Sequence, residues 1–188
     1  MGWRKILIIL VINVLVFTFG AEGPKGMKFS VPQLSEEEQE SAHLPNYLKC
    51  DACLAVAYQL QTALAKNRKS GRLAESDVFD IMEYVCEISF QNYGLKEVEG
   101  VKRLSGPGLP TENVAAMTQM GGKWPSRIQE ICHMYLGEIG EMEIYRAFQE
   151  DPHQLSVFMC YGQGVQGYCN HQKDIKVEEH DHVSKDEF

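Results

Sequence analysis

The spacing of apolar positions along the chain predicts a series of amphipathic helices. Apolar residues recur at steps of three and four over residues 47–66, which is the period of one helical face. The predicted buried face of this segment consists of Cys50, Cys53, Leu54, Ala57, Leu60 and Leu64. A second helix is expected over 76–89, with Ser76 or Asp77 as its N-cap. Its predicted buried stripe consists of Val78, Phe79, Met82, Val85 and Cys86.

The same period returns in the last third of the helical region. Pro125 suits the first turn of a helix that reaches about residue 138, and another helix is expected over 141–149. Their predicted buried residues are Ile128, Ile131, Cys132, Tyr135 and Leu136 in the first and Ile144, Tyr145 and Phe148 in the second. A weak helix is expected over 111–120, and a short segment follows at about 155–160.

Residues 90–110 interrupt the helical period. The run Gly106-Pro107-Gly108-Leu109-Pro110 marks turns, and short helical or extended pieces are expected before it, for example over 95–104. No alternation of apolar and polar positions continues for longer than about five residues. The pattern therefore predicts an all-α domain over 47–169. Trp124, Tyr135, Tyr145 and Phe148 are expected in its core, with a surface for clients or lipid as the alternative.

The first twenty residues have the pattern of a secretory signal peptide. Arg4 and Lys5 precede an apolar run over 6–19, which is shorter than the roughly 20 residues that a membrane-spanning helix needs. Small residues near Gly20 suit cleavage after that position. The sequence therefore predicts residues 1–20 as a signal peptide, and no later stretch has the apolar length of a transmembrane segment.

Acidic, polar segments flank the predicted domain. We expect a flexible acidic arm over 21–46 and a disordered tail over 170–188. The whole chain carries a net charge of -8 and no basic block, which argues against sequence-independent nucleic-acid binding. The last four residues resemble the Lys-Asp-Glu-Leu retention signal of the endoplasmic reticulum: Lys185, Asp186, Glu187 and Phe188. With the signal peptide, they predict residence in the lumen, and the aromatic last residue leaves room for partial secretion.

The six cysteines are expected to form disulfides in such an oxidising compartment. Cys50 and Cys53 form a CxxC motif, which a thiol–disulfide oxidoreductase would use at a helix N-terminus after a strand. No convincing strand precedes it, and Asp51 would disfavour a neighbouring thiolate. A structural role is the alternative that we favour, because residues three apart on a helix project from nearly one face and can each reach a different partner.

The economical structural pairing is nested. Its three bonds are Cys50 with Cys169, Cys53 with Cys160, and Cys86 with Cys132. It would join the first helix to the end of the domain and the second helix to the third. Each bond closes a long loop and could contribute on the order of 4 kcal/mol in the loop-entropy model, and less where loops are shared.

The order of these cysteines among amphipathic helices resembles the saposin-like fold. The chain is similar to the canopy group of saposin-related chaperone cofactors over about residues 33–169. The segments that carry this resemblance are 41–45, Cys50 to Cys53, 101–109, 124–127 and 135–138. The interval between Cys86 and Cys132 is longer than in saposins, which implies a long insertion at about 87–131 between the second and third core helices.

The resemblance implies a folding cofactor of the endoplasmic-reticulum lumen. Its expected clients are immunoglobulin heavy and light chains, whose assembly and secretion it would promote together with endoplasmin and the heavy-chain binding protein. Links to B-cell function, calcium homeostasis and integrin-mediated adhesion are also implied. A thiol–disulfide oxidoreductase that uses Cys50 and Cys53, and a saposin-type lipid binder, are the alternatives.

No motif for enzymatic chemistry accompanies these features. The sequence contains no HExxH, P-loop, GxSxG or GxGxxG pattern, and no EF-hand loop. The cluster of His180 and His182 in the tail is only a weak metal-binding pattern, since a site needs a preorganised shell. We therefore expect a non-enzymatic protein without catalytic residues, cofactor or metal.

Overall fold

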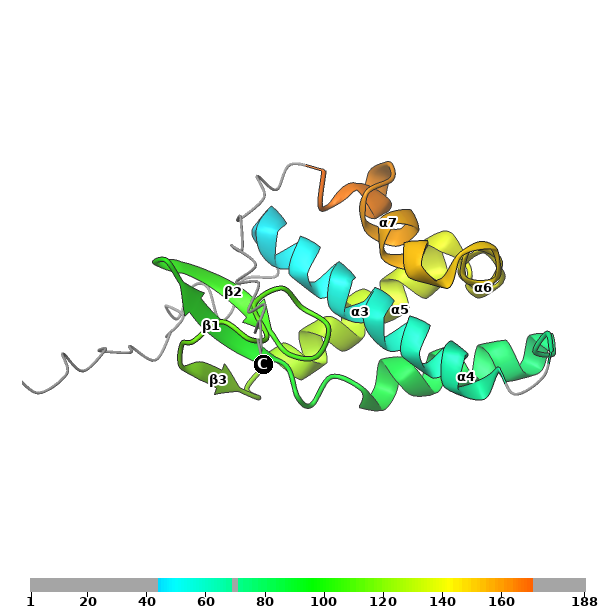
Figure 1. The fold of residues 1–188 in the computed structure, drawn as a ribbon, viewed down its shortest axis with the longest axis horizontal. Helices are drawn as coiled ribbons and strands as arrows, with labels where there is room; N and C mark the ends of the chain where they lie inside the picture. Colours follow the sequence, from blue (N-terminus) through cyan, green and yellow to red (C-terminus); the bar gives the residue numbers. More distant parts are fainter. Residues whose placement is uncertain (1–43, 69–70, 171–188) are drawn as a thin grey trace, which may run out of the picture.

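The computed structural model describes residues 44–68 and 71–170, which form a mostly helical domain with a small sheet at one end (Figure 1). The helices of this part are α3 (Asn46–Asn67), α4 (Glu75–Ile88), α5 (Trp124–Ile139), α6 (Glu141–Glu150) and α7 (Leu155–Cys160), and the strands are β1 (Gly94–Val98), β2 (Val101–Ser105) and β3 (Thr118–Met120). Single turns of 3-10 helix span Pro152–Gln154 and Gly164–Gly167. None of these helices has both the length and the apolarity required to cross a bilayer.

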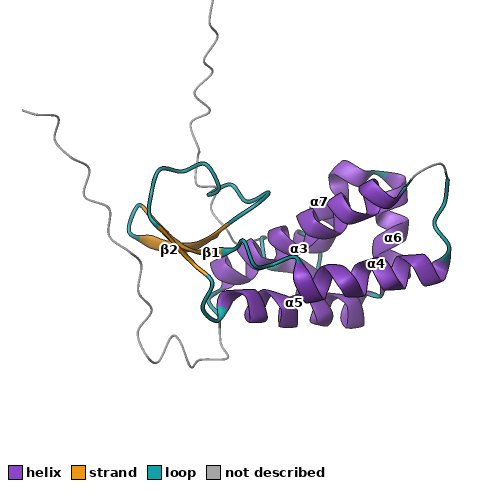
Figure 2. Cartoon of the chain, turned by 90° about the horizontal axis from the view of Figure 1, so that it is seen from below, coloured by secondary structure: helices purple, strands orange, loops and turns teal. Residues whose placement is uncertain are grey.

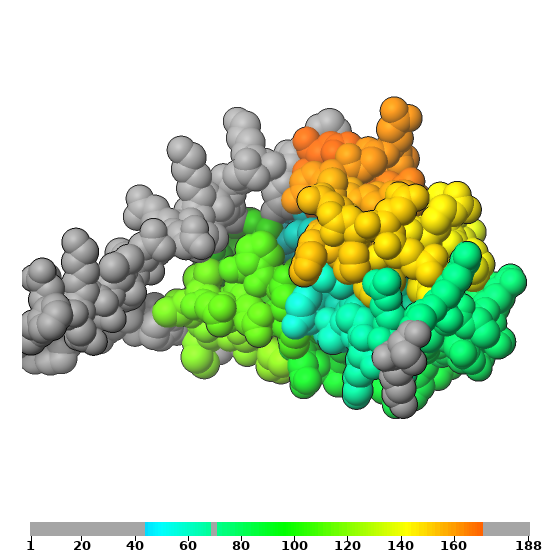
Figure 3. All heavy atoms as spheres, turned by 45° about the vertical axis from the view of Figure 1, so that its right-hand side comes forward, coloured from blue at the N-terminus to red at the C-terminus, as the bar shows by residue number. Residues whose placement is uncertain are grey.

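Helix α3 is the centre of the domain. It contacts α4, α5, α7 and β2, so that helices surround it and the sheet lies beside its first turns (Figures 1 and 2). Small residues permit this close packing: Ala52, Ala55 and Ala57 are fully buried. In the space-filling view the start of α3, coloured cyan, is visible only as a narrow strip between the green sheet segment and the yellow and orange helices (Figure 3). The burial of α3 therefore extends well beyond the single face that its apolar period predicts.

Helix α4 forms at the predicted place but differs in two details. The helix starts one residue before Ser76, because the carbonyl of Ala74 already accepts the amide of Val78 at 3.1 Å, and no side chain caps it. The predicted N-cap is therefore wrong. Phe79 is also not part of the core: it is 37% exposed, because Val78, Met82, Val85 and Cys86 form the face that packs on α3 and α5 and Phe79 lies at its edge.

The later helices agree closely with the apolar period. Pro125 lies in the first turn of α5, where its missing amide costs no hydrogen bond. Gly140 separates α5 from α6 with a φ of 88°, a conformation that glycine adopts without strain. The apolar residues expected in the core are buried, apart from the half-buried Ile131. The four aromatic residues Trp124, Tyr135, Tyr145 and Phe148 are buried as well.

A three-stranded antiparallel sheet lies between α4 and α5 in sequence, so the all-α prediction is wrong in this segment. The order is β2-β1-β3, and β1 pairs with β2 in the register that sets Leu95 opposite Leu104. Glu99 and Gly100 connect the two strands with φ values of 52° and 77°, which is the backbone of a tight two-residue hairpin. The weak helix expected over 111–120 is not formed; turns and β3 occupy that stretch.

Strand β1 lacks the alternation of polar and apolar residues that identifies a half-exposed strand, because both of its faces are covered. Four of its residues are buried and the fifth is half-buried, so polar and apolar positions do not alternate. Lys96 in particular is only 4% exposed, although its charge predicts a solvent-facing position.

The loop after β2 packs directly against α3. The hydroxyl of Tyr93 donates to the carbonyl of Pro107 at 2.6 Å and accepts from Nε2 of Gln59, a residue of α3, at 2.9 Å. Gly108 has a φ of 78°, and a Cβ placed on it would lie 2.2 Å from the ring of Tyr58. Only glycine permits both this backbone conformation and this close approach.

We therefore expect Gly108→Ala to destabilise the protein by about 2 kcal/mol, through left-handed strain and the clash with Tyr58. Gly137→Ala is the matched control, because Gly137 lies on the exposed side of α5 and a Cβ added there would meet no other atom within 4 Å. This control should gain about 0.5–1 kcal/mol from helix propensity. Urea unfolding followed by circular dichroism measures both; equal effects of the two substitutions would contradict the close packing of the loop.

Candidate functional site

The CxxC motif lies in the first two turns of α3 and binds the end of the domain. Cys50 is bonded to Cys169 with 4.8 Å between the Cα atoms, and Cys53 is bonded to Cys160 with 5.8 Å. Both spacings are ordinary for disulfides. Because the two cysteines are one turn apart, they face the same direction and together fix α7 and the segment after it against α3.

The third disulfide joins Cys86 near the end of α4 to Cys132 in the middle of α5, with 5.5 Å between the Cα atoms. The three bonds are the nested pairs favoured from the sequence. They close intervals of 119, 107 and 46 residues, so each restricts the unfolded chain over a long loop.

Cys50 and Cys53 lack the surroundings of a redox centre. All six cysteines are in disulfides, and Cys50 and Cys53 are bonded to distant cysteines instead of each other. Cys50 is 1% exposed and Cys53 is fully buried. A reactive thiol pair requires access to a substrate disulfide and a stabilised thiolate. The arrangement is that of two structural crosslinks.

Asp51, between the two cysteines, holds the sheet. Its carboxylate is fully buried and accepts two hydrogen bonds from the guanidinium of Arg103 in β2, at 2.7 Å to Nε and 2.6 Å to Nη2. The backbone amide of Leu104 donates to the same carboxylate at 3.1 Å. The hydrogen bond to Asp51 raises the pKa of Arg103 above its ordinary value. Asp51 thereby attaches the edge strand β2 to α3, because its carboxylate binds both the Arg103 side chain and the backbone amide of Leu104.

A second buried cation, Lys96, lies beside Arg103 on the same face of the sheet, because the two residues are paired across β1 and β2. The ammonium of Lys96 donates to the carbonyls of Thr111, Glu112 and Val114 at 2.8, 3.1 and 3.0 Å. Burial lowers the pKa of Lys96, and the charge of nearby Glu112 opposes that shift. The hydroxyl of Thr111 donates in turn to the carbonyl of Leu104. Lys96 thus holds residues 111–114 in a fixed turn beneath β1.

The burial of Arg103, Lys96 and Asp51 was not predicted from the sequence. Asp51 was considered only as a neighbour of the cysteines, and Lys96 only as a position in an irregular segment. A signal for Asp51 was nonetheless present, since an acidic residue within an otherwise apolar and Ala-rich helix face needs a partner when buried. Nothing in the spacing indicates that the partner is Arg103.

Together these contacts make a rigid body whose exposed parts are available for partners. Within the part of the chain that the structure describes, no group of three His, Cys, Asp or Glu side chains is placed to hold a metal ion. Several predicted features lie outside the described residues. They are the predicted signal peptide, the predicted acidic arm up to residue 43, the pair His180 and His182, and the predicted retention signal of Lys185, Asp186, Glu187 and Phe188. Large apolar side chains on the described surface include Tyr84 and Ile88 of α4.

Removal of the buried carboxylate should be costly. We expect Asp51→Asn to destabilise the protein by about 3 kcal/mol or more, because the buried Arg103 guanidinium loses this carboxylate. Glu143→Gln is the control, since Glu143 forms an exposed ion pair with Arg146 and should change stability by less than about 1 kcal/mol. The two midpoints of denaturant unfolding measure this difference. A neutral effect of Asp51→Asn would contradict the anchoring role.

Comparison with known proteins identifies the family of the chain. No protein-family model matches it. The human protein named marginal zone B- and B1-cell-specific protein is 38% identical over 92% of this chain and 96% of its own length. The mouse protein of the same name is 37% identical over 81% of this chain, and the bovine protein is 40% identical over 81%. The chain therefore belongs to the family of marginal zone B- and B1-cell-specific proteins.

Proposed function

We propose that this protein is a folding cofactor of the endoplasmic-reticulum lumen that helps immunoglobulin heavy and light chains to assemble and promotes antibody secretion. The observation that carries the proposal is the family membership, because the relatives are named for marginal zone B and B1 cells and match the chain over most of its length. The sequence resemblance to the canopy group of chaperone cofactors supports the same role. Endoplasmin and the heavy-chain binding protein are the proposed chaperone partners.

The proposed location rests on the two ends of the chain. Residues 1–20 have the pattern of a secretory signal peptide, and Lys185 to Phe188 resemble a retention signal. Three disulfides suit an oxidising compartment. Phe188 stands where the retention signal has leucine, which should weaken retention, and we therefore propose that part of the protein is secreted. The resemblance also implies links to B-cell function, calcium homeostasis and integrin-mediated adhesion, which are further parts of the proposal.

The proposed mechanism is non-enzymatic. The helical core is proposed to be saposin-like, with residues 87–131 as an insertion that adds the sheet. Disulfides, the Asp51–Arg103 pair and the Lys96 turn hold these parts in one fixed geometry, so that binding a client costs little ordering of the cofactor itself. Burial of Cys50 and Cys53 in separate disulfides argues against the oxidoreductase alternative.

Crosslinking and immunoprecipitation from an antibody-secreting cell test this proposal. We expect the epitope-tagged full-length protein to capture immunoglobulin heavy and light chains together with luminal chaperones. A tagged luminal protein of similar size and charge is the control for nonspecific capture.

Absence of immunoglobulin chains from the captured material, when the control and the expression level are matched, would overturn the proposed function. Tight binding of the purified protein to liposomes at neutral or acidic pH would instead support the saposin-type lipid binder.

A further inference from the structure

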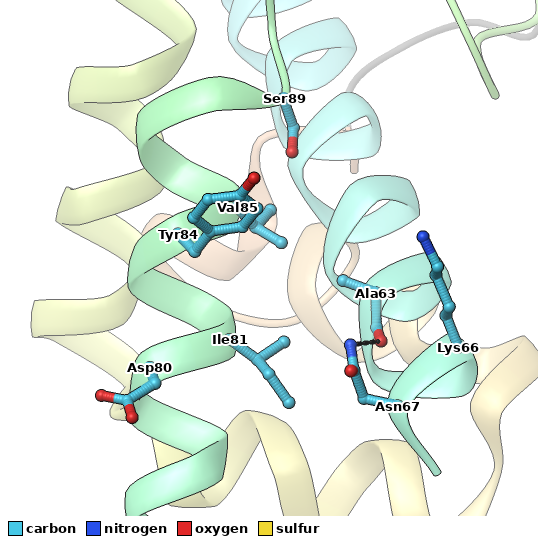
Figure 4. Close-up of a pocket in the computed structure, with 8 residues that line it drawn as sticks. All are labelled: Ala63, Lys66, Asn67, Asp80, Ile81, Tyr84, Val85 and Ser89. Carbon is cyan, nitrogen blue, oxygen red and sulfur yellow. Dashed lines mark hydrogen bonds between the residues drawn. The ribbon is translucent and has the colours of Figure 1, made fainter. Parts of the chain in front are cut away.

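A groove runs between the second half of α3 and the facing side of α4. It encloses about 450 Å³ and is open to solvent. Its apolar lining comes from Ala63 of α3 and from Ile81, Tyr84 and Val85 of α4, while Lys66 and Asp80 lie on its two rims (Figure 4). The side chain of Asn67 is held by its hydrogen bond to the carbonyl of Ala63 at 2.8 Å. All of the residues that line the groove belong to α3 or α4 except Ser89, which follows α4 directly, so the two helices determine its shape.

Apolar side chains extend from the groove along the surface of α4. Tyr84 is 61% exposed and Ile88 is 46% exposed, and both lie three to seven residues from the half-buried Ile81. At that spacing the three side chains form one stripe along the helix. An exposed stripe of this kind beside a groove marks an interaction surface better than scattered apolar residues do.

The stripe is embedded in negative charge. Helix α4 carries Glu75, Asp77, Asp80, Glu83 and Glu87 and no basic residue. Asp77 lies four residues before Ile81, and Asp80 and Glu87 lie four before and three after Tyr84, so these carboxylates flank the apolar stripe on the same face. Lys66 on the α3 rim is the one cation among the groove-lining residues. The surface favours an occupant that combines apolar side chains with positive charge.

Charge and helix propensity disfavour the occupants that this chain itself would supply. The predicted tail over 170–188 and residues 35–46 of the predicted arm are acidic and would be repelled by α4. Residues 21–34 carry Lys25 and Lys28 against Glu22, but their two prolines and two glycines disfavour an amphipathic helix. A second copy that docked by the same face would set two rows of carboxylates against each other. The complementary occupant is a segment of a different protein.

We propose that the α3–α4 groove and its apolar stripe bind a basic amphipathic segment of another luminal protein. Such a segment presents two or more bulky apolar side chains to Ile81, Tyr84 and Ile88, with Lys or Arg beside them to meet Asp77, Asp80 and Glu87. This inference deepens the proposed function, on which it rests, by naming the surface and the chemistry of the partner.

Fluorescence anisotropy with a defined peptide tests the surface. The probe is a fluorescein-labelled peptide of about three helical turns, built of leucine and lysine with leucine at every third or fourth position. The full mature protein should bind it, and binding should weaken as NaCl rises from about 0.05 M to about 0.5 M. The same peptide with every lysine replaced by glutamate should not bind. Equal binding of both peptides would overturn the proposal.

Matched surface variants locate the binding. Tyr84→Ala and Asp80→Lys should each weaken binding of the basic peptide by about tenfold. Tyr161→Ala and Glu138→Lys are the controls, because Tyr161 is a 48% exposed aromatic residue just after α7 and Glu138 is an exposed acid near the end of α5, and neither lines the groove. These controls should leave binding within about twofold. Equal losses in the α4 variants and the controls would contradict a site at α4.

The same variants separate this inference from the proposed function. If Tyr84→Ala and Asp80→Lys leave the capture of both immunoglobulin chains and luminal chaperones in cells unchanged, these partners bind elsewhere and the groove proposal fails. If the wild-type protein captures no immunoglobulin while the peptide still binds at α4, the proposed function fails and the groove proposal stands. A dimer in sedimentation velocity that Tyr84→Ala dissociates would show that a second copy occupies the groove, and would overturn the proposal.

Discussion

The first turns of α3 are bonded to two distant parts of the chain at once. Cys50 and Cys53 point toward the end of the domain and are crosslinked to Cys169 and Cys160, while Asp51 between them points toward the sheet and pairs with Arg103. A helix turn has more than one face, so adjacent residues can hold separate elements. The disulfides restrict the unfolded chain, and the buried ion pair requires that β2 keep its place for the carboxylate to remain satisfied.

This junction explains how the surfaces of the protein are positioned. Once the first half of α3 is fixed between α7 and the sheet, its second half extends beside α4, and the Cys86–Cys132 bond holds α4 against α5. The groove between α3 and α4 therefore lies between elements that are crosslinked elsewhere, which keeps its shape without a ligand. The carboxylates that flank the apolar stripe on α4 would then add charge selectivity to the proposed site.

The sequence predicts the helical part of this fold well, because apolar residues such as Met82, Ile128 and Ile144 repeat with the helical period and are buried where expected. It also indicates a structural role for Cys50 and Cys53. Short helical or extended pieces were expected over 95–104, where most of β1 and β2 lie, but a sheet was not predicted. Leu95 shares a face of β1 with Glu97, and Lys96 shares the other with Val98, so neither face is uniformly apolar. The Asp51–Arg103 pair and the α3–α4 groove depend on contacts between segments far apart in the chain, which spacing along one helix does not encode.

Disulfide mapping of the unreduced mature protein tests the structural junction most directly. Cleavage on the amino side of Asp51 separates Cys50 from Cys53, and cleavage after Tyr161 or Tyr168 separates Cys160 from Cys169. Mass spectrometry should then find Cys50 linked to Cys169 and Cys53 linked to Cys160. A bond between Cys50 and Cys53, or free thiols at both positions, would contradict the account, since α3 would no longer be crosslinked to the end of the domain.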